Sequence, residues 1–369
     1  MRRDGSDGKP RWTMVWERPA PSLLAFSLSP NGQTIAWLSE KGQVRRFHSE
    51  TGDQLWRTPP ISGMDSLAAA PGGQVLVWKR LAPQRAEIMI LDAVSGISNA
   101  RIQPISGPIW AVVVALDGKS YVVGAGDRSI TRWALGGAAS PPKTVHVEGY
   151  PETLALAQDG SFACGTWLPS GISTSKGWRH RETDPARWFD VTLSADGNTL
   201  VALSRHGARR RASASDPKLM VWDRPTGRLL WEQKIEGTEP RLLVSEDGGV
   251  IALSFVATTH YTTGDLSERR LSLFARNGSH LAPDRGGSYL APELVALSAS
   301  GNRITVLDMD RSLCTLDRAG RTVARLPLPL DPDTNQPHPI RSTQSSADGQ
   351  TLLLHRGDGN LALYRATAE

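Results

Sequence analysis

The chain has 369 residues, with 42 Lys and Arg against 37 Asp and Glu and a formal net charge of +5. This mild positive charge permits an anionic partner, but a dedicated nucleic-acid binder concentrates its charge in one patch or helix, so nucleic acid is not the favoured ligand. The 35 glycines and 25 prolines are scattered along the whole sequence, as in proteins of many short strands joined by tight turns. No stretch of roughly 18 apolar residues or apolar leader occurs, so we expect a cytoplasmic, monomeric protein without a membrane span.

An apolar strand followed by a turn that ends in glycine recurs eight times, at intervals of about 40–50 residues. The turn glycines are Gly32, Gly73, Gly118, Gly160, Gly197, Gly248, Gly301 and Gly349. Most follow Asn or Asp, as in hairpins whose tight turn needs a positive φ. We therefore predict a structural role for these glycines, in particular Gly32, Gly118, Gly197 and Gly349.

The first repeat shows the elements of one unit in chain order. Alternating or apolar segments at Leu23–Ser29, Thr34–Leu38 and Gln43–His48 are followed by a short segment that carries Leu55 and Trp56. These segments predict four antiparallel strands, named a to d from the centre outward. One such sheet cannot bury both of its faces alone, whereas a ring of sheets can. The fold class is therefore predicted as an all-β, eight-bladed β-propeller with four antiparallel strands per blade.

The predicted domain limits follow from this count. Residues 1–10 are expected to be a flexible N-terminus, and residues 11–369 a single propeller. Its blades are expected to start near residues 23, 66, 109, 152, 188, 240, 293 and 341. The eighth repeat lacks a d strand, whereas the strand-like segment 12–17 has no partner of its own. Docking of residues 12–17 as the outer strand of the last blade would pair an open edge, so the N-terminal strand is predicted to close the ring.

Short motifs within the repeats point to known families. The segments Thr51–Trp56 and Thr226–Trp231 both read Thr-Gly-x-x-Leu-Trp and resemble the element typical of quinoprotein-like repeats. In that family the tryptophan docks between blades, which implies structural roles for Trp56 and Trp231. The triplet Val221–Asp223 resembles the end of a WD repeat. The resemblance covers nearly the whole chain as architecture, although only one repeat keeps the Trp-Asp pair.

The irregular connections are the expected places for function. The b–c connection lengthens in blade 2 (Lys79–Glu87), blade 5 (Arg205–Lys218) and blade 6 (Ala257–Arg270), and Pro169–Arg187 of blade 4 shows no clear strand pair. Strand alternation places all b–c connections on the face of the d–a connections. The cationic residues predicted to bind a partner there are Arg179, Arg181, Arg205, Arg209, Arg210, Arg211 and Lys218. A solvated loop without a ligand is the alternative interpretation of the same charges.

Catalytic and cofactor motifs were sought among the same residues. The eight histidines form no metal-binding motif, and the triplet Gly118–Ser120 lacks the first glycine of a phosphate-binding loop. We therefore expect no cofactor, no metal and no catalytic residue. The predicted function is a non-catalytic scaffold that presents its loop-bearing face to a protein partner. The alternative is an enzyme or small-ligand binder that uses the central channel, because propellers host both kinds of function.

Overall fold

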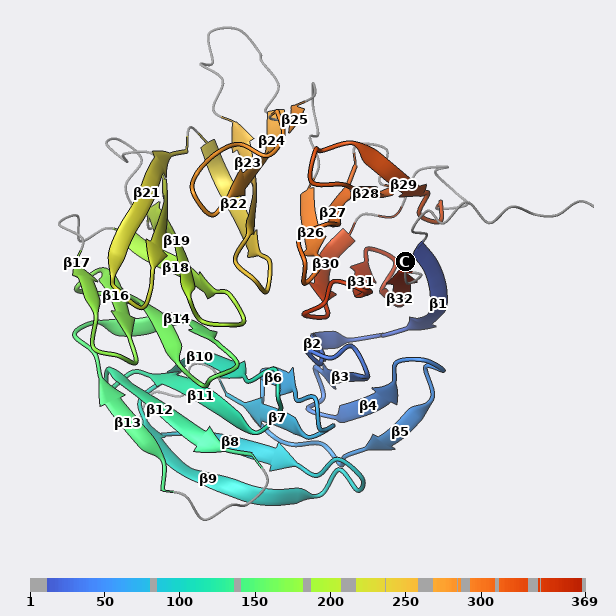
Figure 1. Ribbon diagram of the computed structural model, residues 1–369. Helices are drawn as coiled ribbons and strands as arrows, with labels where there is room; N and C mark the ends of the chain where they lie inside the picture. The colour runs from blue at the N-terminus through green and yellow to red at the C-terminus, as the bar shows by residue number, and fades with distance from the viewer. Residues whose placement is uncertain are drawn as a thin grey trace, which may run out of the picture.

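The structure is a computed structural model, and it describes residues 12–79, 85–135, 141–181, 187–206, 217–235, 237–257, 268–283, 285–286, 293–308, 312–330, 338 and 340–366. These residues form eight sheets of four antiparallel strands each, arranged in a ring around a central opening (Figure 1). The predicted eight-bladed propeller is confirmed. The predicted flexible segment 1–10 lies outside the described residues.

Blades 1 to 4 follow one another along the chain. Blade 1 contains β2 (Leu23–Leu28), β3 (Thr34–Ser39), β4 (Val44–His48) and β5 (Gln54–Arg57). Blade 2 contains β6 (Ser66–Ala69), β7 (Val75–Trp78), β8 (Arg85–Leu91) and β9 (Ser98–Ser106). Blade 3 contains β10 (Ile109–Val114), β11 (Ser120–Ala125), β12 (Ser129–Ala134) and β13 (Lys143–His146). Blade 4 contains β14 (Tyr150–Leu156), β15 (Phe162–Trp167), β16 (Gly171–Thr174) and β17 (Arg179–Arg181).

Blades 5 to 8 complete the ring. Blade 5 contains β18 (Arg187–Leu193), β19 (Thr199–His206), β20 (Lys218–Asp223) and β21 (Arg228–Lys234). Blade 6 contains β22 (Gly237–Val244), β23 (Val250–Ala257), β24 (Glu268–Ala275) and β25 (Arg285–Gly286). Blade 7 contains β26 (Glu293–Leu297), β27 (Ile304–Leu307), β28 (Leu313–Leu316) and β29 (Thr322–Leu326). Blade 8 contains β30 (Ile340–Ser345), β31 (Thr351–Arg356), β32 (Asn360–Ala366) and, as its outer strand, β1 (Trp12–Pro19).

Blade 4 corrects one prediction. The segment 169–187, which was expected to hold no clear strand pair, contains β16 and β17, and these two strands pair from Gly171 opposite Arg181 to Ser173 opposite Arg179. The segment lacks the long apolar runs of other blades because its strands have only four and three residues. The b–c connection of blade 4 is therefore short, between Trp167 and Gly171.

The hydrophobic core is divided among the blade interfaces. The described residues form eight apolar clusters, and each cluster joins two neighbouring blades. In β3, Ile35 and Trp37 pack against blade 8, while the alternating Ala36 and Leu38 pack against blade 2. Because both faces of each b strand are buried, these strands are apolar at nearly every position.

Tryptophan side chains fasten the outer strands to the next blade. The indole nitrogens of Trp16, Trp56 and Trp231 donate to backbone oxygens of the neighbouring c–d turn, at 2.8, 3.0 and 2.8 Å. In the Trp56 contact, a Cβ built on Gly96 would lie 2.7 Å from the indole ring, and Gly96 has a φ of +67°. Glycine is therefore needed there both for the backbone conformation and for close approach of the ring. Trp56 is buried and Trp231 is half-buried.

The N-terminal strand closes the ring as predicted. β1 pairs with β32 from Trp12 opposite Ala366 to Pro19 opposite Asn360, and Figure 1 shows the two strands side by side. The carboxylate of Glu17 accepts hydrogen bonds from the buried guanidinium of Arg356 and from the amide of Asn360, both at 2.7 Å. Trp12 reaches Thr315 of blade 7 at 2.9 Å. β1 thus holds blades 7, 8 and 1 together.

Candidate functional site

The turns between the a and b strands converge on the centre of one face of the disc. The turns that read Ser-x-Asp-Gly share one hydrogen-bond pattern, which Ser194 and Asp196 illustrate. The hydroxyl of Ser194 donates to Oδ1 of Asp196 at 2.5 Å, and the same carboxylate oxygen accepts from the backbone N–H of Asn198 at 2.9 Å. The turns of blades 6 and 8 repeat this pattern. The turn glycines Gly32, Gly118, Gly197 and Gly349 all have positive φ, between +66° and +69°.

Backbone hydrogen bonds connect consecutive a–b turns around the opening. From blade 4 to blade 8, each turn donates from its backbone to a carbonyl of the next turn, as when Ala195 N–H donates to Glu246 O at 2.7 Å. The series continues across the closure, where Ala347 N–H donates to Pro30 O at 2.8 Å. From blade 4 to blade 1, the main chain therefore holds the edge of the channel mouth together.

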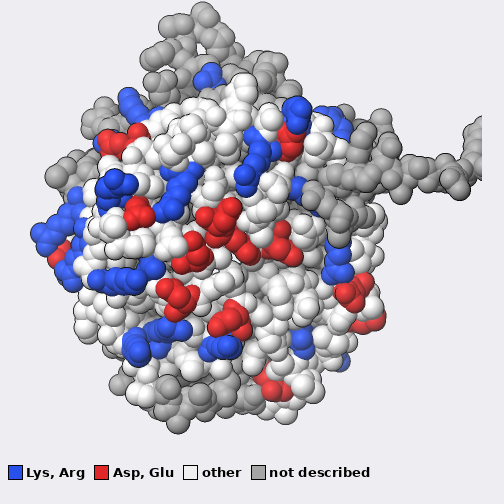
Figure 2. Space-filling model, in the orientation of Figure 1, with Lys and Arg blue, Asp and Glu red and all other residues white. Residues whose placement is uncertain are grey.

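Acidic side chains surround this mouth. They belong to the a–b turns, and Figure 2, which views this face, shows acidic residues gathered around the central hollow with Lys and Arg farther out. We call this set the acidic rim: Asp117, Asp159, Asp196, Glu246, Asp247 and Asp348. The sequence contained the signal, because the Asp-Gly turns recur and all a–b turns of a propeller meet at its centre. Sequence reasoning missed it by treating the turns only as scaffold.

Glu246 is the residue of the rim whose carboxyl pKa is raised. Burial raises the pKa of its carboxyl, and the neighbouring carboxylates of Asp348 and Asp247 raise this pKa further. A raised pKa in the folded state means that the ionised form destabilises the fold. Glu246 therefore stabilises the protein fully only below its unfolded pKa of about 4.3, and this stabilisation is lost as the pH rises through the raised folded pKa.

We predict that Glu246→Gln raises the melting temperature at pH 7.5 and that the gain shrinks toward zero at pH 4. The neutral amide removes the repulsion without removing the backbone contacts of residue 246. Thermal unfolding at the two pH values measures the effect. Glu50→Gln, at a peripheral glutamate with 65% side-chain exposure that pairs with Arg365, is the matched control and should give no gain. A Glu246→Gln variant no more stable than the wild type at pH 7.5 would contradict the prediction.

Five arginine side chains outside the rim donate hydrogen bonds to backbone carbonyls of blade turns. We call Arg46, Arg132, Arg224, Arg276 and Arg318 the arginine collar. Arg132 donates to Gly160 O of the next blade at 3.2 Å, and Arg276 donates to Asn198 O at 3.3 Å and to Asp223 at 2.8 Å. The buried Arg224 donates to Gly197 O and lies 3.6 Å from Asp159. Arg132, Arg224 and Arg276 therefore link turns of neighbouring blades, whereas Arg318 bonds the a–b turn of its own blade.

The channel itself has two parts. Near the a–b face it is a cavity of about 360 Å³ lined mainly by apolar side chains of the a strands, with Glu246 at its edge. A second cavity, of about 550 Å³, lies farther along the a strands and is more polar, with Asp190, Arg241 and Gln344 among its lining residues. Gln344 is also a closure contact, because its side chain bonds the backbone of β2 at Leu28 N–H (2.7 Å) and Phe26 O (2.9 Å).

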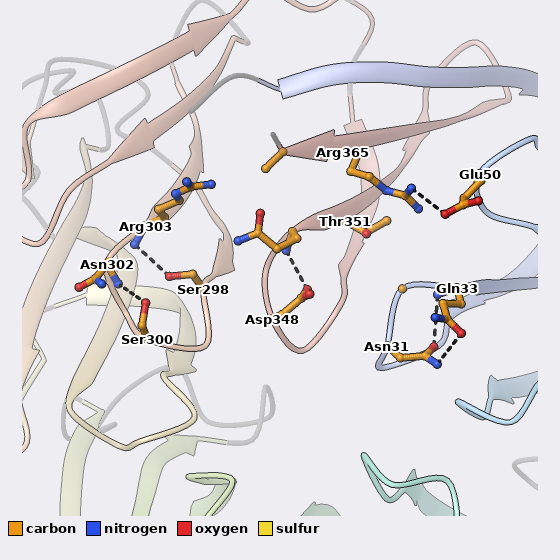
Figure 3. A pocket seen from close by; sticks show the side chains of 13 residues that line it. Asn31, Gln33, Glu50, Ser298, Ser300, Asn302, Arg303, Asp348, Thr351 and Arg365 are labelled. Carbon is orange, nitrogen blue, oxygen red and sulfur yellow. Dashed lines mark hydrogen bonds and ion pairs between the residues drawn. The ribbon is translucent and has the colours of Figure 1, made fainter. Parts of the chain in front are cut away.

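A third hollow, of about 540 Å³, lies on the same face at the closure of the ring (Figure 3). It is bordered by the a–b turns of blades 7, 8 and 1, at the one blade whose c and d strands come from opposite ends of the chain. Its lining is polar, and Figure 3 shows Arg365 directed at Glu50, to which it is bonded at 3.4 Å, and Asn31 beside Gln33. Arg365 with Glu50 and Asn31 with Gln33 thus satisfy one another's polar groups within the hollow.

The structure places the predicted partner-binding residues in different positions. Arg179 and Arg181 lie on β17, the outer strand of blade 4, and not on a b–c loop as predicted. Both bind Glu148 of the preceding d–a connection, at 2.8 and 2.6 Å. The prediction was wrong here because the short strands β16 and β17 were not recognised. The long b–c connections therefore belong to blades 2, 5 and 6.

The remaining predicted residues belong to blade 5. Lys218 begins β20, and its ammonium lies 3.8 Å from Glu232 of β21. Arg205 is in β19, one residue before the end of the strand. Arg209, Arg210 and Arg211 lie outside the described residues. The cationic surface therefore stays a prediction, with Arg179, Arg181 and Lys218 each placed beside a glutamate in the described residues.

The cysteine thiols and the possible metal ligands do not form a reactive site in the described residues. Cys164 and Cys314 are buried free thiols, and burial raises the pKa of both, which makes them poor nucleophiles. Within the described ranges, no three His, Cys, Asp or Glu side chains lie close enough together to hold a metal ion. The same part of the chain contains no helix long and apolar enough to cross a bilayer.

The fold and the channel define the class of the protein as an eight-bladed propeller. No protein-family model and no curated protein matches the sequence. Among solved structures, the chain is similar to BamB from Moraxella catarrhalis, with a TM-score of 0.61 and 16% identity over 96% of this chain and 99% of that one. It is also similar to a eukaryotic initiation factor, with a TM-score of 0.59 and 14% identity over 90% and 81% of the two chains. At such identities the likeness shows the fold.

Proposed function

We propose that this propeller, residues 11–369, is a non-catalytic interaction scaffold that presents its loop-bearing face to a protein partner. The observation that carries the proposal is the contrast between the two parts of the molecule. The blades are joined by eight apolar interfaces and, from blade 4 through blade 8 to blade 1, by backbone contacts between their turns, whereas long b–c connections separate β7 from β8, β19 from β20 and β23 from β24. A rigid ring that carries variable loops on one face suits partner recognition.

We also propose kinship with quinoprotein-like repeats, in preference to WD repeats. The support is the set of docked tryptophans. Two of them, Trp56 and Trp231, end the Thr-Gly-x-x-Leu-Trp segments, and Trp16 makes the same contact from the closing strand. The Trp-Asp pair of WD repeats occurs only once in the sequence, as Trp222 and Asp223 at the end of β20, where Asp223 binds Thr226 and Arg276.

The test of the scaffold is partner capture by the intact protein. Tagged wild-type protein is used to isolate partners that mass spectrometry identifies, and the complex is then rebuilt from two purified proteins. A stable complex of defined stoichiometry supports the proposal. Failure to rebuild any protein complex, together with catalytic turnover of a small molecule, would favour the alternative of a channel enzyme.

For the loop-bearing face, we predict that Arg209→Glu, Arg210→Glu and Arg211→Glu together abolish capture and leave the melting temperature nearly unchanged. In the sequence they follow β19 and precede β20, and the apolar interfaces of blade 5 are formed by other side chains in the residues that the structure describes, so we expect the reversed charge to alter binding and not the core. The attraction should weaken with salt. The matched control reverses Arg57, Lys143 and Arg228, which are exposed on outer strands, and should retain capture.

Two outcomes would contradict this prediction. Equal capture by both triple variants would show that the charges are not used. Micromolar binding of generic single-stranded or duplex DNA that is lost only in the Arg209–Arg211 variant would assign the face to nucleic acid.

A further inference from the structure

The face that carries the a–b turns lies opposite the loop-bearing face, and it has a second candidate surface at the mouth of the channel. The 360 Å³ cavity there, which we call the throat, is lined by apolar side chains that include Leu28, Val113, Leu156, Leu193, Leu243 and Leu297. They come from the a strands of six blades. The volume is at the lower end of the range of about 300–1,000 Å³ that is usual for ligand pockets. It is large enough to hold one large apolar side chain.

The charges at the entrance to the throat limit what can enter it. Glu246 lines the throat, and the carboxylates of Asp247 and Asp348 are near enough to raise the pKa of Glu246. The arginine collar is bonded to turn carbonyls, to Asp223 and, through Arg224, to Asp159 of the rim. The entrance therefore has acidic side chains around an apolar cavity, and Figure 2 shows these acidic residues gathered about the central hollow.

The mouth is also preorganised. Because the backbone contacts between turns hold the positions of Ala195, Glu246 and Ala347, a ligand does not have to order the rim when it binds. Low ordering cost favours recognition of a short segment, for which few contacts are available.

We propose that the throat and the acidic rim bind a basic segment of a protein partner, with one large apolar side chain in the throat and flanking Lys or Arg side chains on the rim carboxylates. This surface is additional to the loop-bearing face, and it rests on the proposed function only in that its occupant is a protein. The charge complementarity excludes acidic segments, and the apolar lining disfavours segments that carry charge alone.

The test uses a labelled, capped heptapeptide, Lys-Arg-Ser-Leu-Ser-Arg-Lys, and fluorescence anisotropy with the full-length protein. Two matched peptides replace the leucine by Gly or the four basic residues by Gln. We expect each replacement to weaken binding by roughly tenfold, because burial of a leucine and several exposed ion pairs each contribute on that scale.

Protein variants test where the peptide binds. Glu246→Gln with Asp247→Asn and Asp348→Asn should weaken binding of the parent peptide by roughly tenfold. The control triple, Glu50→Gln with Asp53→Asn and Glu232→Gln, removes the same charge from exposed peripheral positions and should change binding less than about twofold. Leu243→Phe and Val113→Phe fill the throat from two different blades. Either one that keeps the wild-type melting temperature should abolish the preference for leucine over glycine.

Several results would overturn the inference. They are the absence of binding at millimolar peptide, equal binding to the rim and control triples, or an unchanged leucine preference in a folded throat variant. Tighter binding of spermine than of the peptide, with the same dependence on the rim, would assign the site to a small polyamine. If partner capture fails for the wild type, the scaffold proposal fails. If capture persists in the rim triple while the peptide results are negative, only this inference fails.

Discussion

Deletion of residues 1–18 is expected to lower the free energy of unfolding by about 5 kcal/mol or more. The deletion removes the edge partner of β32, the contacts of Trp12 and Trp16, and the carboxylate that pairs with buried Arg356. Loss of a large core aromatic costs about 3–5 kcal/mol, and loss of one partner of a buried ion pair costs a similar amount. Since whole domains are stable by only about 5–15 kcal/mol, the truncated protein should be largely unfolded or aggregated at 37 °C.

Chemical denaturation and thermal melting of the two proteins measure this effect. The matched control is deletion of residues 1–11, which leaves β1 intact and should melt with the full-length protein. Coincident melting of the 1–18 deletion and the full-length protein would mean that β1 does not hold the ring.

Trp56→Ala is expected to destabilise the protein by about 3–5 kcal/mol, the range for truncation of buried large aromatics. The indole fills the interface between blades 1 and 2 with Val44 and Leu91, donates to Ala93 O and covers Gly96. Trp231→Ala should cost less, because its indole is half-buried, although it makes the equivalent contact with Arg276 O.

Urea denaturation of the two variants gives the order of the effects. Trp56→Phe keeps most of the apolar contact and loses the hydrogen bond, so it should fall between the wild type and Trp56→Ala. Leu55→Ala, at the neighbouring side chain that is 45% exposed, is the control and should change stability by less than about 0.5 kcal/mol. A cost near zero for Trp56→Ala would refute the docking role.

The ring could be predicted from the sequence because its signals are local and repeated. The a–b turns need a positive φ, and Asp-Gly and Asn-Gly pairs indicate such turns in the sequence. The unpaired segment 12–17 likewise matched the missing outer strand of the last repeat. Blade 4 was described wrongly because β16 and β17 are too short to show strand periodicity. The pairing of β17 with β16 is a tertiary constraint that three residues alone do not reveal.

The candidate site was less accessible to sequence reasoning. The partners of Arg179 and Arg181 lie more than 30 residues away, so their engagement with Glu148 could not be read from local charge. The acidic rim, in contrast, could have been predicted, because the sequence shows the recurring Asp of the a–b turns and a propeller brings those turns together at its centre. What the sequence could not provide was the apolar throat below the rim, since its volume depends on how a strands from different blades meet.

The sharing of blade 8 between the two ends of the chain has a consequence for biosynthesis. Glu17 and Arg356 are 339 residues apart, and ribosomes add about 5–20 residues per second. The first strand therefore leaves the ribosome and waits about 15–70 seconds for the strand with which it pairs. During that interval its backbone edge has no native partner, although Trp16 can already reach Ser49 of blade 1, and blades 1 to 7 can stack only as an open arc. A nascent chain that stalls before Asn360 would keep β1 available to chaperones or to strands of other chains, so synthesis of β32 is itself the event that allows the ring to close.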